Sequence, residues 1–197
     1  SASPALMKGS RESGAGRWTV IQVPTMSFYE YCELLDLDRP NIAYDLKVTT
    51  LLHKSQIERT QIMMQLSKVQ NHFMRYLQVG GFPELALADN DLMAQQIMRE
   101  DVVDKVLKRD LPSLYNIRNA TELERIFLYL CNVSSEIVSI EAITKELNGV
   151  SRTTVENYIQ YLESANLIYQ SWPVDMAGKK VLKARPKIYI ADAAIRN

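Results

Sequence analysis

The chain has no excess of charge of either sign. Its 197 residues carry 23 basic and 23 acidic side chains, so the formal net charge at pH 7 is zero. Proteins that bind nucleic acid tightly and without regard to sequence usually have a strongly positive surface. The balance argues against that class of protein, although it leaves room for a local basic patch.

Cysteine is scarce, and long apolar runs are absent. Cys32 and Cys131 lie far apart and match no metal-ligand spacing, so we expect two reduced, largely buried thiols. No apolar run approaches the ~20 residues that a membrane-spanning helix needs. Residues 1–16 are small and polar and do not resemble a signal peptide. The sequence therefore predicts a soluble, cytoplasmic protein without membrane contact.

Common motifs for catalysis and cofactor binding are missing too. No phosphate-binding loop G-x-x-x-x-G-K-[ST] occurs, because Gly178 is followed by two lysines. The dinucleotide pattern G-x-G-x-x-G is absent as well. His53 and His72 have no acidic or cysteine partner at ligand spacing. We therefore expect this chain to hold no catalytic residue, metal or cofactor of its own.

The beginning of the chain predicts a strand and a helix. Residues 17–23 are rich in β-branched and aromatic side chains and end before a proline, which favours a strand. Ser27 and Glu30 form a capping box, in which two side chains bind the unpaired N–H groups at a helix start. The helix is expected to end near Leu35.

Two longer helices are predicted next. Residues 54–79 have apolar side chains every three or four positions, which indicates one helix with one buried face. The segment Gly80–Glu84 ends it, because paired glycines and a proline do not continue a helix. A further helix is predicted from Asp91 to Arg109, stopping before Pro112. The expected inward residues are Ile62, Leu66, Val69, Phe73, Tyr76 and Leu77 in the first helix and Met98, Val102 and Val106 in the second.

The last third has the most specific pattern. Thr121 and Glu124 form a second capping box before a helix, and Ser139 caps a shorter one. The turn Asn148–Val150 leads to a third helix capped by Ser151. This order is the layout of a helix-turn-helix. The expected inward residues are Leu123, Ile126, Phe127, Leu130, Ile140, Ile143, Leu147, Val155, Tyr158, Ile159 and Leu162.

A hairpin is expected directly after the third helix. Residues 167–172 predict a strand, a turn contains Gly178, and residues 181–182 predict a return strand, with a further strand at Lys187–Ile190. A hairpin in this position is the wing of a winged helix. The predicted fold class is mainly α (α+β), a helical region followed by a winged helix-turn-helix with a short β-hairpin wing.

The winged helix has two candidate uses. The outward residues at the start of the third helix are the ones that reach base edges in this geometry, and a basic wing can neutralise phosphates. The candidate nucleic-acid contacts are Arg152, Thr153, Asn157, Lys179, Lys180, Lys183 and Arg185. Against this, Glu156 and Glu163 dilute the charge of the helix. A protein-protein or interdomain module therefore remains an alternative.

Several motifs in a fixed order resemble those of a known family. They are Ser1–Met7, Glu12–Arg17, Val23–Glu30, Tyr76–Glu84, Arg109-Asp110, Ser151–Tyr158 and Lys187–Asp192. In this order they resemble the prokaryotic AAA-type (AAA+ superfamily) ATPases that have a C-terminal winged helix and a restriction-nuclease-like domain. The resemblance covers essentially the whole chain. One departure is Pro24-Thr-Met-Ser-Phe28, which is one residue longer than the family's usual segment.

The resemblance implies an ATPase of which this chain is a fragment. Residues 1–53 would be the end of the ATPase core, 54–118 a helical lid or linker, and 119–197 the winged helix running into the first strand of a truncated domain. The Walker motifs, with ATP and Mg, would precede the chain. Ser1 or Ser3 would sense the γ-phosphate, and Arg17 would approach nucleotide phosphate or form a structural salt bridge.

Three functions follow as expectations. The first is nucleic-acid binding, with double-stranded DNA as partner and no enzyme activity in the fragment itself. The alternative is an interaction module in which the winged helix packs on its own ATPase domain or another protein and makes no DNA contact. A free-standing transcription regulator is a third, for which residues 54–79 would supply a dimer helix.

Overall fold

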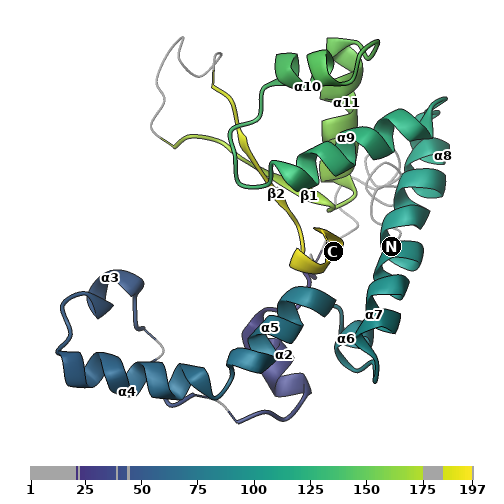
Figure 1. The fold of residues 1–197 in the computed structure, drawn as a ribbon. Coiled ribbons are helices and arrows are strands. Elements are labelled where there is room, and N and C mark those ends of the chain that lie inside the picture. Colours follow the sequence, from purple (N-terminus) through teal and green to yellow (C-terminus); the bar gives the residue numbers. More distant parts are fainter. Residues whose placement is uncertain (1–20, 22, 39, 44, 175–183, 197) are drawn as a thin grey trace. The chain divides into compact units, whose positions relative to one another are not determined.

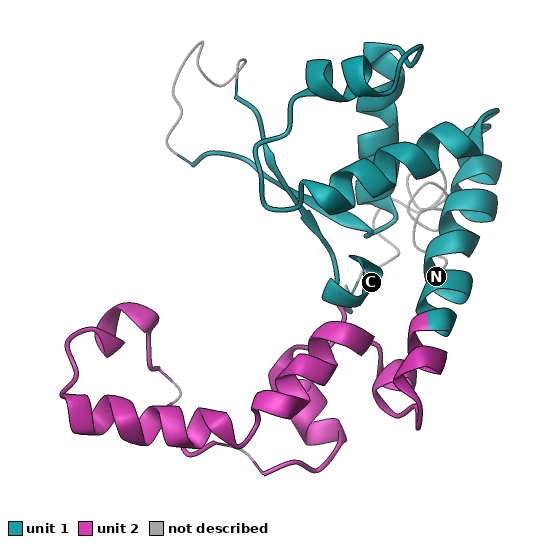
Figure 2. Cartoon of the chain, viewed as in Figure 1, with its two compact units in different colours: residues 1–23, 96–197 teal, residues 24–95 magenta. Residues whose placement is uncertain are grey.

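The computed structural model describes residues 21, 23–38, 40–43, 45–174 and 184–196. The chain divides into two compact units, one of residues 24–95 and one of residues 1–23 and 96–197 (Figure 2). The described elements are mostly helices, together with a two-stranded antiparallel sheet. The predicted fold class, mainly α with a small β component, is confirmed.

The unit of residues 24–95 is helical. Its elements are α2 (Phe28–Leu34), α3 (Val48–Leu51), α4 (Gln56–Ser67), α5 (Gln70–Val79), α6 (Pro83–Ala86) and the beginning of α7 (Asp91–Ile97). The capping box of α2 is confirmed, because Ser27 Oγ accepts from the Glu30 N–H while the Glu30 carboxylate accepts from the Ser27 N–H. Helices α2, α5 and α6 pack together around the buried Tyr31 and Leu85.

The single helix predicted over 54–79 is wrong, since two helices form there. The chain breaks at Lys68 and Val69, whose N–H groups bind carbonyls three residues back rather than four. Ser67 Oγ donates to the Met64 carbonyl at 2.8 Å, a contact that loosens the end of a helix. Helix α4 has no buried residue, so the continuous buried face expected there is absent.

The glycine pair after α5 serves a close approach of two backbone segments. Gly80 has a φ of 80°, which ends the helix. The Met26 N–H donates to the Gly81 carbonyl at 2.7 Å, and Tyr76 Oη donates to the Met26 carbonyl at 2.7 Å. A Cβ on Gly81 would lie 2.8 Å from the Met26 nitrogen, so a side chain cannot fit. The segment Tyr76–Glu84, one of the motifs behind the family resemblance, therefore holds the segment before α2 in place.

The helical path after residue 97 runs further than predicted. It continues through π-helical turns, η1 (Met98–Asp104) and η2 (Val106–Asp110), into α8 (Leu111–Tyr115). The expected stop before Pro112 is wrong, because the wider turns place this proline in the first turn of α8, where its missing N–H is not needed. The path ends at Asn116, whose φ is 53°.

The helix-turn-helix is confirmed by three helices, α9 (Ala120–Asn132), α10 (Ile140–Glu146) and α11 (Arg152–Ser164), which Figure 1 shows together. Ser139 and Ser151 cap α10 and α11 as predicted. The cap of α9 differs. Asn119 rather than Thr121 accepts the helix N–H, from Glu122, so the helix begins two residues earlier than the capping box indicated.

The sheet completes the winged helix. β1 (Ile168–Ser171) pairs antiparallel with β2 (Lys187–Ile190), with Ile168 opposite Ile190 and Tyr169 opposite Tyr189. Ile137, before α10, bridges to Lys187 on the other edge of β2. Lys187–Ile190 is thus the return strand of the wing, whereas the resemblance placed it at the opening of a following domain. The predicted return strand at 181–182 lies outside the described residues, as does most of the strand at 17–23.

One hydrophobic core holds this unit together. It includes residues from every helix of the helix-turn-helix and from both strands, among them Leu123, Ile143, Leu162, Ile168 and Ile188, all fully buried. Cys32 and Cys131 are both buried, and neither forms a disulfide within the described residues, as predicted. Within the described ranges no helix is long and apolar enough to cross a membrane.

Candidate functional site

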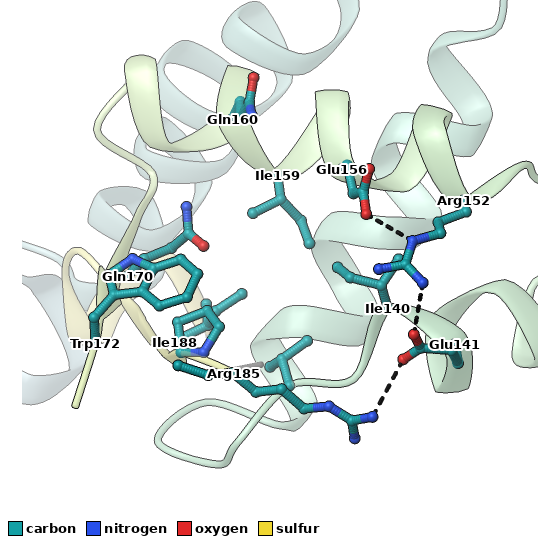
Figure 3. Close-up of a pocket in the computed structure, with 13 residues that line it drawn as sticks. Ile140, Glu141, Arg152, Glu156, Ile159, Gln160, Gln170, Trp172, Arg185 and Ile188 are labelled. Atoms are coloured by element: carbon teal, nitrogen blue, oxygen red, sulfur yellow. Dashed lines mark hydrogen bonds and ion pairs between the residues drawn. The ribbon is translucent and has the colours of Figure 1, made fainter. Parts of the chain in front are cut away.

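A pocket of about 560 Å³ lies between the start of α11, the start of α10 and the sheet (Figure 3). Its apolar floor is formed by Ile159 of α11 and Ile188 of β2, both buried, together with the half-buried Ile140 of α10. These residues come from three elements that the winged-helix core holds in fixed positions. The pocket is called the α11 groove below.

A chain of ion pairs closes one end of the α11 groove. Arg152 Nε donates to Glu156 at 2.8 Å, one helical turn along α11, and Arg152 Nη1 donates to Glu141 at 2.8 Å. The second oxygen of Glu141 lies 3.6 Å from Arg185 Nη2. Two guanidinium groups therefore face two carboxylates, and this end of the groove has no net charge (Figure 3).

The pKa shifts follow from the same contacts. The pKa of Glu141 lies below its usual value, because its own backbone N–H and the Ser139 hydroxyl donate to the carboxylate, with Arg152 and Arg185 nearby. The pKa of Arg152 is raised, first by the hydrogen bond to Glu156 and then by the charge of Glu141. Both shifts favour the charged forms of Glu141 and Arg152, which compensate each other.

The opposite end of the groove is aromatic and amide-rich. Trp172 follows β1 and is 54% exposed, beside Gln170 in Figure 3. Glu163 of α11 fixes Gln170, accepting from its backbone N–H at 3.0 Å and from its side-chain amide at 2.7 Å. An exposed indole over a buried apolar floor is the kind of surface that protein interfaces use.

The candidate nucleic-acid residues that the structure describes lie in different parts of the winged helix. Arg152 and Arg185 meet at the α11 groove through Glu141. Thr153 is exposed, and Asn157 lines a second pocket, of about 330 Å³, with Tyr158 and Tyr161. The candidates Lys179, Lys180, Lys183, Ser3 and Arg17 lie outside the described residues.

Sequence reasoning missed Glu141, Gln170 and Trp172. The alternation of a strand could have placed the last two, since residues 168, 170 and 172 share one face and Ile168 is buried. Nothing local indicates that Glu141 meets Arg185, because they lie on different elements. Among the described residues no group of three or more His, Cys, Asp or Glu could hold a metal ion.

Comparisons with other proteins give a family and two relatives. Residues 70–197 match the family described as "Domain of unknown function (DUF8612)". An "Uncharacterized protein" of Haemophilus influenzae is 24% identical over 156 residues, 77% of this chain and 38% of that protein. "Uncharacterized protein MJ1544" of Methanocaldococcus jannaschii is 32% identical over 119 residues, 58% of this chain and 25% of that protein. No solved structure matches.

Proposed function

The chain belongs to the DUF8612 family, and we propose that its winged helix is a protein-docking module of a longer protein. The observation that carries this proposal is the α11 groove, which is neutral at one end and apolar on its floor. A docking surface of this composition suits another protein, because interface cores are poor in net charge and rich in exposed aromatic anchors.

The same groove disfavours DNA reading by the start of α11. A phosphate would have to draw Arg152 away from two carboxylates that it contacts at 2.8 Å. Glu141 and Glu156 would then face the phosphate and repel it. The positive charge of Arg152 at the start of α11 is therefore already compensated by Glu141 and Glu156.

We assign the docking partner to the remainder of the longer protein. The matched segments span 38% and 25% of the two relatives, which are much longer than the part they share with this chain. The resemblance to AAA-type ATPases suggests an ATP- and Mg-dependent core, so docking would couple the winged helix to the nucleotide state of that core. Two buried cysteines outside any disulfide, Cys32 and Cys131, support a cytoplasmic location, because thiols stay reduced in that compartment.

Hydrogen exchange tests the docking proposal. Amide exchange is measured at residues 138–141, 156–160 and 170–172, once in the 197-residue chain and once in the intact protein from the full open reading frame. Docking predicts slower exchange at these segments in the intact protein, because a bound partner excludes water. Equal exchange in both proteins would reject the proposal. The segment 126–130 of α9, in which Ile126, Phe127 and Leu130 are buried in the domain's own core, is the internal control.

Nucleic-acid binding is the second candidate. Thr153 and Asn157 are exposed in the first half of α11, the part of a recognition helix that reaches base edges. The wing sequence adds Lys179, Lys180 and Lys183. This candidate predicts that the chain retards duplex DNA in a gel at ~50 mM salt, where phosphate contacts are strong. Free migration of every duplex at that salt would remove it.

A further inference from the structure

The two arginines of the α11 groove differ in how fully they are bound. Arg152 makes two contacts of 2.8 Å through separate nitrogens. Within the described residues Arg185 makes one ion pair, at 3.6 Å, and its side chain is 56% exposed. A guanidinium has five N–H donors, so Arg185 keeps donors for a further acceptor. The loosely held cation at this end of the groove is Arg185.

Arg185 stands next to the apolar part of the groove. It immediately precedes Pro186 and β2, whose Ile188 belongs to the floor. Figure 3 shows the Arg185 side chain below Ile188, with its guanidinium towards Glu141 and away from Trp172. A ligand that covers Ile188 and extends towards Glu141 would therefore meet this guanidinium.

We propose that the α11 groove binds a peptide segment in which a carboxylate side chain stands next to a large apolar side chain. This inference rests on the proposed docking function and names the chemistry of the docked segment. The carboxylate takes the open donors of Arg185, with which it can form two parallel hydrogen bonds. Glu141 stays paired with Arg152, and the apolar side chain covers Ile159, Ile188 and the exposed indole of Trp172.

The charge that is open to a ligand matches a single negative charge. Glu141 and Glu156 are each paired with Arg152 at 2.8 Å, so the more loosely held Arg185 is the cation that an incoming anion meets. A phosphate monoester carries about −1.5 to −2 charges at pH 7, whereas a carboxylate carries one, as does each phosphodiester of DNA. The apolar floor adds a favourable contact that a nucleic-acid backbone cannot use. The groove therefore matches an acidic and apolar peptide better than DNA.

Fluorescence of Trp172 gives a direct test. The sequence has two tryptophans, so the 197-residue chain with Trp18→Phe leaves one indole. The probe is N-acetyl-Leu-Asp-Leu-amide, and N-acetyl-Leu-Asn-Leu-amide is the same peptide without the charge. We expect the Asp peptide to shift the emission and to bind about 10-fold more tightly than the Asn peptide, since a charged hydrogen bond contributes ~1.5 kcal/mol.

Two variants separate this contact from general charge effects. Arg185→Gln is expected to abolish the preference for the Asp peptide. The control Lys145→Gln removes an exposed cation of α10 outside the groove and is expected to keep the preference. Equal binding of both peptides, no binding of either at millimolar concentration, or equal effects of both variants would overturn the proposal.

The remaining outcomes distinguish the two proposals. If the groove is protected from exchange in the intact protein but shows no preference for the Asp peptide, docking stands and the carboxylate chemistry is wrong. If the groove is not protected, docking itself fails. A Trp172 emission change caused by a duplex of ~20 base pairs and lost in Arg185→Gln would overturn the peptide proposal in favour of nucleic acid.

Discussion

Arg75 of α5 is bound by four acceptors in the unit of residues 24–95. Its guanidinium donates to Asp91 at 2.8 Å, to Tyr31 Oη at 2.9 Å, and to the carbonyls of Ala86 and Ala88 at 2.9 and 2.8 Å. The planar fork of an arginine suits such a divergent set, which a lysine could not match. One side chain thus ties α2, α6 and the start of α7 to α5.

Arg75→Met is expected to lower the free energy of unfolding by about 2–3 kcal/mol, because partly buried acceptors lose charged donors. Urea denaturation followed by circular dichroism measures this loss. The matched control is Arg59→Met on the exposed face of α4, where a change within about 0.5 kcal/mol is expected. Equal effects of the two substitutions would show that the network around Arg75 does not stabilise the unit.

At the scale of single residues, the pKa of Glu58 at the start of α4 is also shifted. Its pKa is lowered from 4.5 to about 2, because the Ser55 hydroxyl and backbone N–H donate to the carboxylate and Lys54 lies 3.2 Å away. A carboxyl group whose pKa is lower in the folded state stabilises that state above its unfolded pKa. That contribution should be lost as the pH falls from about 4.5 towards 2.

The amide proton shift of Ser55 during an acid titration measures this effect by NMR. We expect a midpoint well below 4.5 in the wild type and a midpoint nearer 4.5 in Ser55→Ala, which lacks the donating hydroxyl. Glu58→Gln keeps an acceptor but cannot titrate, so it should show no midpoint. A wild-type midpoint at 4.5 would contradict the capping geometry.

At the scale of elements, helix starts show how far local sequence predicts structure. The caps of α2, α10 and α11 were predicted because the Ser side chain and the N–H that it binds lie three residues apart. The start of α9 was misplaced because Asn119 and Thr121 are both good cap residues and only the path of the chain decides between them. The break at Lys68 and the π-helical turns after Ile97 were missed for a similar reason, since periodicity does not report how a turn is hydrogen-bonded.

The two possible caps of α9 can be compared directly. Asn119→Ala is expected to lower the free energy of unfolding by about 1 kcal/mol, because the Glu122 N–H loses its acceptor. Thr121→Ala should change it little, since Thr121 lies inside the first turn of α9. Thermal or urea unfolding measures both. A larger loss for Thr121→Ala would restore the capping box that the sequence indicated.

At the scale of the whole molecule, the order of helices and strands in the winged helix was predictable and the α11 groove was not. Each helix and strand of the winged helix has its pattern within a few residues. The groove joins Glu141, Arg152 and Trp172 from three elements, and their contacts arise only after the domain folds. From the sequence alone, Arg152 and Arg185 were therefore predicted to contact phosphate. In the structure both are paired with Glu141.

Because Arg152 and Arg185 are paired with Glu141 in the folded domain, we can make a prediction for the intact protein. Docking, taken with the ATPase activity that the resemblance implies, predicts that Arg185→Gln changes the rate of ATP hydrolysis several-fold, because the proposed groove contact with the rest of the protein would be weakened. Docking also predicts that the triple substitution Lys179→Glu, Lys180→Glu and Lys183→Glu has no effect in a DNA retention assay at ~50 mM salt, because the wing would not contact DNA. The opposite pattern, lost retention in the triple variant and an unchanged rate in Arg185→Gln, would support nucleic-acid binding by the wing. An intact protein without ATP hydrolysis would contradict the resemblance to AAA-type ATPases, while the hydrogen-exchange test of docking would still apply.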